Sequence, residues 1–131
     1  MKQISRRVRI VLVAALLVAI AVLVPNLVDS REPTHELRIT ARDMSFHVET
    51  LDGPNPALQL AAGTEVKVVL RNEDRGMVHD FGIPEWGVHT GGVAWGGERS
   101  VTFKVPARSS ALSYICTPHS AMMFGRIIVS Q

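Results

Sequence analysis

The segment Cys116-Thr117-Pro118-His119-Ser120-Ala121-Met122-Met123-Phe124-Gly125 determines how the rest of the chain is interpreted. It holds the single cysteine of the chain, followed by one histidine and two methionines. A cysteine thiolate and two imidazoles, with a more distant methionine thioether, form the ligand set of a type 1 (blue) copper centre. The segment supplies three of these four groups, and His79 in Val78-His79-Asp80-Phe81 is available as the second imidazole. The sequence therefore predicts one mononuclear copper site.

The residues on either side of this segment predict an all-β domain. Short apolar or alternating segments recur between turn signals, a pattern typical of a sandwich or barrel. Met44 and Phe46 are expected in its core, and the glycine-rich region 82–97 is expected to be a long loop crossing between sheets. A turn is expected at 72–76. The predicted strands are 36–41, 58–61, 66–71, 78–83, 101–105, 112–116 and 126–130.

The N-terminal region has a different composition from the rest of the 131-residue chain. Four basic residues precede an uninterrupted apolar run from Ile10 to Val24, which is the pattern of an export signal. Extended to Val28, the apolar segment is long enough to span or nearly span a bilayer. Residues 1–30 are therefore predicted to be a signal peptide or, if uncleaved, an N-terminal membrane anchor. Either alternative places the domain at 36–131 outside the cytoplasm, in the periplasm or at the outer face of the membrane.

Charge and cysteine content narrow the possible functions. Four of the 14 Lys and Arg residues and one of the 12 Asp and Glu residues precede Arg31, so the remainder has a formal net charge near −1. Such a domain lacks the basic surface of a nucleic-acid-binding protein. A single cysteine cannot form an internal disulfide, and an unprotected thiol is open to oxidation outside the cytoplasm. Both points favour a metal-bound thiolate.

The pattern Tyr114-x-Cys116-Thr117-Pro118-His119-x-x-x-Met123-x-Gly125 resembles the C-terminal copper loop of the cupredoxins, the family of plastocyanin and azurin. The segment around Val78-His79-Asp80-Phe81 resembles the strand that carries the family's first histidine ligand. The resemblance covers about 36–131. It implies a Greek-key β-sandwich that carries single electrons and is not an enzyme. The implied ligands of one type 1 copper are His79, Cys116, His119 and Met123.

Two ligand positions have alternatives. Counting from Cys116 along the shortest loops of the family selects Met122, whereas aligning the Met-x-Gly that opens the final strand selects Met123. Strand register is the stiffer constraint, because a one-residue slip turns a side chain to the opposite face, and Met123 is therefore preferred. His89 also lies upstream of the loop, but the strand setting favours His79. Asp80 stands where the family commonly has an asparagine that bridges to the cysteine loop. An ionised carboxylate accepts hydrogen bonds without donating them, which implies an altered potential or pH dependence.

The resemblance also implies how the domain would be used. His119 is expected at the exposed edge of the site, and its redox partners are expected to dock weakly. A c-type cytochrome or a membrane oxidoreductase complex is an expected partner. The alternative function is copper binding or delivery in the cell envelope, which Met122 and His89 slightly favour. A thiol hydrolase fits poorly, because Cys116 ends an apolar strand and does not start a helix. A binuclear copper centre would need a second cysteine.

Overall fold

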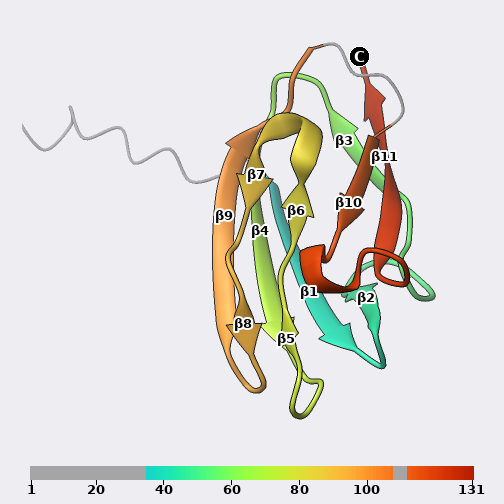
Figure 1. Cartoon of the computed structure of the whole chain (residues 1–131). Coiled ribbons are helices and arrows are strands. Elements are labelled where there is room, and N and C mark those ends of the chain that lie inside the picture. Colours follow the sequence, from blue (N-terminus) through green and yellow to red (C-terminus); the bar gives the residue numbers. More distant parts are fainter. Residues whose placement is uncertain (1–34, 108–111) are drawn as a thin grey trace, which may run out of the picture. The chain divides into compact units, whose positions relative to one another are not determined.

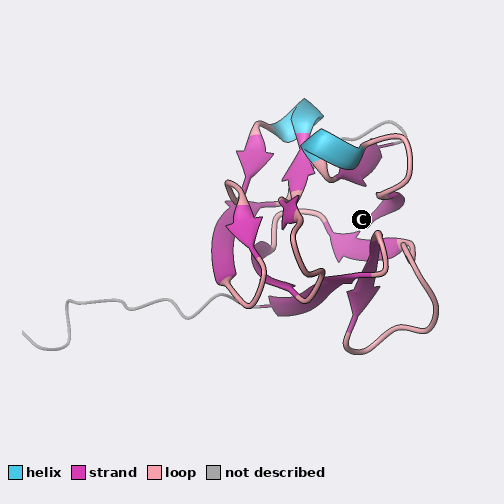
Figure 2. Cartoon of the chain, turned by 60° about the horizontal axis from the view of Figure 1, so that its bottom comes forward, coloured by secondary structure: helices cyan, strands magenta, loops and turns pink. Residues whose placement is uncertain are grey.

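Eleven strands and two single-turn 3-10 helices make up the part of the chain that the computed structural model describes, residues 35–107 and 112–131 (Figures 1 and 2). The predicted signal or anchor at 1–30 lies outside the described residues. Among the residues that are described, no helix is long and apolar enough to cross a membrane. The elements are β1 (His35–Arg42), β2 (Ser45–Val48), β3 (Leu58–Ala61), β4 (Glu65–Asn72), β5 (Val78–His79), β6 (Gly82–Ile83), η2 (Pro84–Trp86), β7 (Val88–His89), β8 (Val93–Ala94), β9 (Glu98–Lys104), β10 (Leu112–Ile115), η3 (Thr117–His119) and β11 (Phe124–Ser130).

The strands form two main sheets. One has the order β2-β1-β4-β9 and the other the order β3-β11-β10-β6-β7, while β5 and β8 form a separate pair. Strands β1 and β4 are parallel, as are β3 and β11, and the remaining pairs are antiparallel. The parallel pairs join strands that are not consecutive in the chain, so the connections cross between the sheets (Figure 1). The predicted all-β sandwich is confirmed.

Alternating burial along the strands explains why the sheets face each other. In β1, Leu37, Ile39 and Ala41 are buried, whereas the alternate residues Glu36 and Arg38 are exposed. Successive side chains of a strand point to opposite faces, so this pattern gives the sheet one apolar face. The other sheet contributes an apolar face of its own, which includes Leu58, Leu60, Leu112, Tyr114 and Ile127. The domain core lies between the two faces.

Three aromatic rings fill the core next to the predicted ligands. Phe46, Phe81 and Tyr114 are all fully buried. The ring of Phe81 stacks on that of Tyr114 at a centroid distance of 5.5 Å, and the ring of Phe46 lies 6.0 Å from Phe81 and 5.4 Å from Tyr114. Phe81 follows His79 by two residues, and Tyr114 precedes Cys116 by two residues. The packed rings therefore fix the backbone on both sides of the site.

The predicted strand at 78–83 is divided in two. β5 pairs with β8, whereas β6 pairs with β10 and β7. At the break, the Asp80 N–H donates to Cys116 Sγ and the Phe81 N–H donates to Thr90 Oγ1, in place of bonds to a neighbouring strand. The glycine-rich region 82–97 is likewise not one long loop, because β6, β7 and β8 lie within it.

The connection between β1 and β2 also differs from expectation. Asp43 and Met44 have φ values of 52° and 55°, so both occupy the left-handed region, as in a two-residue hairpin turn of the primed type. Met44 is therefore half-buried in a turn and not in the core, whereas Phe46 is fully buried as predicted. The usual Asn-Gly or Asp-Gly signal is absent from this turn, which explains why the sequence did not reveal it.

Candidate metal centre

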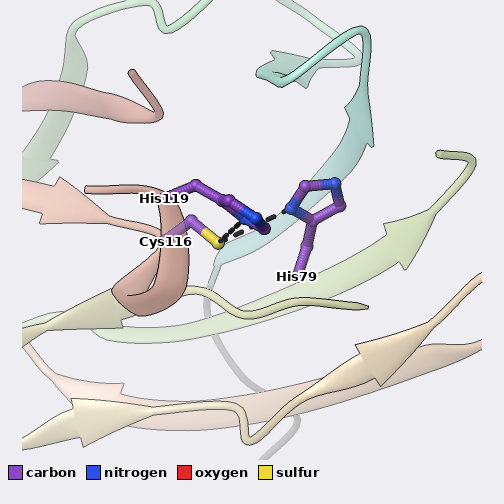
Figure 3. Close-up of side chains that lie close together, drawn as sticks. All are labelled: His79, Cys116 and His119. Carbon is purple, nitrogen blue, oxygen red and sulfur yellow. Dashed lines mark hydrogen bonds between the residues drawn. The ribbon is translucent and has the colours of Figure 1, made fainter. Parts of the chain in front are cut away.

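Three of the predicted ligand residues converge at one end of the sandwich. His79 ends β5, Cys116 follows β10, and His119 ends η3. Their donor atoms all lie within 4.8 Å of one another. Both imidazoles turn Nδ1 toward Cys116 Sγ, at 3.6 Å for His79 and 3.5 Å for His119 (Figure 3). The two rings meet edge to face at a centroid distance of 4.9 Å, which leaves three donors pointing at one position.

The site is largely closed to water. Cys116 and His79 are fully buried, and only His119 is partly exposed. Burial raises the pKa of the Cys116 thiol above its ordinary value, and the nearby Asp80 carboxylate opposes formation of the thiolate. The metal-free thiol consequently keeps its proton at neutral pH, and a metal that binds there has to displace that proton.

Backbone hydrogen bonds hold the loop between Cys116 and Met123 in shape. The Cys116 N–H donates to the Met123 carbonyl at 3.0 Å, and the Met123 N–H donates to the His119 carbonyl at 2.9 Å. Pro118 stands in the first turn of η3, where a missing N–H leaves no bond unmade. Asn55 reaches across from the β2–β3 connection and donates to the Met122 carbonyl at 3.3 Å. Met123 is fully buried, whereas Met122 is 58% exposed.

The sheet behind the loop explains the spacing of Tyr114 and Gly125. These two residues face each other in the β10–β11 pair, and a Cβ at Gly125 would collide with the Tyr114 ring. The ring is held in turn by its hydroxyl, which donates to the Pro56 carbonyl at 2.6 Å. Only glycine therefore lets the strand after the loop lie close to the strand before it.

Asp80 connects the histidine strand to the cysteine loop. Its backbone N–H donates to Cys116 Sγ at 3.5 Å, and its Oδ1 accepts from the Thr117 N–H at 2.6 Å. Its Oδ2 lies 2.9 Å from Nε2 of His89. Because the Gly91 N–H donates to Nδ1 of His89, the ring proton belongs on Nε2 and is donated to Asp80. His89 thus contacts Asp80 and lies outside the cluster of three donors.

Asp74 is a residue of the site that the sequence analysis assigned only to a turn. Its Oδ2 lies 2.9 Å from Nε2 of His79, on the side of the ring away from Cys116. Partial burial raises the pKa of Asp74, but hydrogen bonds from Met44 and Asp43 and the interaction with His79 outweigh it, and the pKa lies below its usual value. In the sequence, the only indication of this contact is a carboxylate shortly before the histidine. Glu73 offered the same signal, so the sequence could not choose between them.

Residues 33–130 match the copper binding proteins of the plastocyanin/azurin family. The chain belongs to this family. Among solved structures, auracyanin B has 22% identity and a TM-score of 0.60, with 78% of this chain and 93% of that chain covered. Rusticyanin from Thiobacillus ferrooxidans has 24% identity and a TM-score of 0.55, with 72% and 76% covered. An amicyanin variant in the Cu(I) form has 16% identity and a TM-score of 0.50, with 72% and 82% covered. These likenesses show a shared cupredoxin fold. A search of curated proteins found no match.

The donor atoms of this cupredoxin suit copper, the cofactor of its family. A thiolate and two imidazoles are the strong ligands of a type 1 centre, and the three converging residues here supply that set. The tautomer also fits, because the Asp74 carboxylate accepts the Nε2 proton of His79 and leaves Nδ1 free to bind metal. Bound copper supplies a reversible one-electron step between Cu(II) and Cu(I), and the chain supplies fixed donors and exclusion of water.

Proposed function

We propose that this cupredoxin is an extracytoplasmic electron carrier with a single type 1 copper. His79, Cys116 and His119 would be the strong ligands and Met123 the weak one. The observation that carries the proposal is the convergence of two Nδ1 atoms on one buried sulfur. The full burial of Met123 and its backbone bonds to Cys116 and His119 support it over the exposed Met122.

The chain is suited to one-electron transfer because its donors are held independently of the metal. His79 is fixed by Asp74, and the Cys116 loop is closed by its own backbone bonds. Asp80 ties these two parts together through Thr117. A site in which the protein sets the geometry reorganises little when its charge changes by one electron. This property favours an electron carrier over an enzyme.

The partner is proposed to dock where His119 reaches the surface. His119 is the only one of the three clustered donor residues with exposed surface. Residues next to the ligands in sequence are exposed and apolar, with Val78 at 52% and Met122 at 58%. Small interfaces of this kind suit brief redox encounters. A c-type cytochrome or a membrane oxidoreductase complex is the proposed partner, and residues 1–30 are proposed to direct or anchor the domain outside the cytoplasm.

Visible absorption and EPR spectra of the full-length protein loaded with Cu(II) test this function. We expect an intense thiolate-to-copper band and a narrow copper hyperfine splitting, both absent from Cys116→Ser. Met123→Leu should shift the spectrum, and the matched variant Met122→Leu should leave it unchanged. A pale spectrum of ordinary tetragonal copper that is insensitive to Cys116→Ser would refute the electron carrier. It would favour copper delivery in the cell envelope.

A further inference from the structure

The side of His79 that faces away from the sulfur is occupied by a carboxylate. Nδ1 of His79 lies 3.6 Å from Cys116 Sγ, and Nε2 lies 2.9 Å from Asp74 Oδ2. The His79 side chain is fully buried, and that of Asp74 is 17% exposed. The hydrogen bond is therefore largely shielded from competing water. Asp74 is thus the charged group that contacts the buried imidazole directly.

Asp74 is itself held from two directions. The N–H groups of Asp43 and Met44 donate to its two carboxylate oxygens at 2.7 Å and 3.0 Å. The positive φ values of these turn residues direct consecutive N–H groups at one acceptor. On its own strand connection, the Asp74 N–H donates to Asn72 Oδ1 at 2.8 Å. The carboxylate is consequently fixed before any metal arrives.

Asn72 extends this support into the sheet. It is fully buried, and its amide group donates to the carbonyls of Met77 and Val93. One side chain thus holds both ends of the β4–β5 connection and the neighbouring strand β8. The hairpin of β1 and β2 and this connection lie at the same end of their sheet, since β1 and β4 run parallel (Figure 1). The support of His79 therefore comes from three separate parts of the fold.

A carboxylate in this position has two physical effects. It keeps the ring proton on Nε2 and raises the basicity of the nitrogen that binds metal. Its negative charge also favours the more highly charged oxidation state, because the attraction to a cation grows with the cation's charge. Both effects should strengthen the binding of Cu(II) more than that of Cu(I).

We propose that Asp74 is a positioning residue for His79, one that fixes its tautomer and lowers the reduction potential by stabilising Cu(II). The proposal rests on the electron-carrier function proposed above. It concerns a residue outside the ligand set, whose effect reaches the copper through a single hydrogen bond.

Asp74→Asn and Glu73→Gln in the full-length protein form a matched pair for the test. Each removes one negative charge from the same connection, but Glu73 is paired with exposed Arg71 and does not contact His79. We expect Asp74→Asn to weaken Cu(II) binding about tenfold relative to Cu(I), which raises the potential by about 59 mV for one electron. Glu73→Gln should produce less than a third of that shift. Equal potentials and equal Cu(II) affinities in the two variants would overturn the proposal.

If Asp74→Asn does not fold, a measurement on the unaltered protein still tests the proposal. In the Cu(I) form, nitrogen-edited NMR should show the His79 proton on Nε2, shifted downfield and exchanging slowly. The His119 ring proton, at the exposed edge, should exchange quickly and serves as the internal reference. Equally fast exchange of both protons would overturn the role of Asp74. A blue protein with that result loses only this inference, whereas a protein without the blue band loses the proposed function as well.

Discussion

His79 and His119 present the same ring nitrogen to Cys116, yet their other nitrogens have different surroundings. His79 is buried on β5, and its Nε2 bonds to Asp74. His119 ends η3 and is partly exposed, and among the described residues none bonds to its Nε2. The protein thus fixes one histidine from behind and leaves the other at the surface. If the proposed function is correct, His79 is the histidine held rigidly by the fold, and His119 is the one through which electrons would reach a partner.

Replacing either histidine by glycine is expected to have the largest effect on the copper site. We expect either change to abolish the blue band. Added imidazole should restore it in His119→Gly, where the gap opens to solvent, and not in His79→Gly, where the gap is closed. An absorption titration with imidazole measures the recovery of the blue band in each variant. Equal recovery would contradict the conclusion that His79 is closed to solvent and His119 is open to it.

Gly125→Ala tests whether the loop side depends on the sheet behind it. The new methyl group would collide with Tyr114, so we expect a loss of about 1–3 kcal/mol in the free energy of unfolding. Urea denaturation of the copper-free protein measures the change. Arg126→Ala, at the exposed neighbouring position, is the control and should change stability by less than about 0.5 kcal/mol. Similar values for both variants would show that the close approach of Tyr114 is unimportant.

The raised pKa of the Cys116 thiol predicts how copper binding depends on pH. Below that pKa the metal-free protein carries the thiol proton, and binding releases it. Copper affinity should therefore rise about tenfold for each unit of pH up to the thiol pKa, and fall in acid. Competition titrations at several pH values measure the slope. Cys116→Ser is the control, because it has no thiol proton to release, and a wild-type slope as shallow as that of the control would be inconsistent with a protonated thiol.

A charge introduced near the exposed histidine is expected to have the smallest effect. Met122→Glu places a charge three residues after His119, in the proposed docking surface, without changing a proposed ligand. We expect a several-fold slower second-order electron transfer to a c-type cytochrome and an unchanged absorption spectrum, since a charge at an interface acts mainly on association. Stopped-flow mixing measures the rate. Ile128→Glu, an exposed apolar position farther along β11, should have little effect. Equal slowing by both would remove the docking surface from this region.

The sequence allowed some parts of this molecule to be predicted because their determinants are local. Cys116 and His119 lie on one short segment, and the structure brings both together with His79. Met123 lies on the same segment, and its role as a ligand stays a prediction. The role of Asp74 could not be predicted, because its acceptor geometry depends on a hairpin about thirty residues away in the chain. The break in the strand at 78–83 was hidden for a similar reason. Its apolar pattern continues through Phe81, and only tertiary partners show where the ladder stops.

The parallel pairing of β3 with β11 has a consequence for how the domain assembles. These strands come from distant parts of the domain, and β11 must lie between β3 and β10. Pairings between distant segments are slow steps in folding, because a long loop must be closed before the contact is made. The loop that carries Cys116 is completed only when β11 docks. We therefore expect the three donors to come together late in folding, and until then the thiol is open to oxidation.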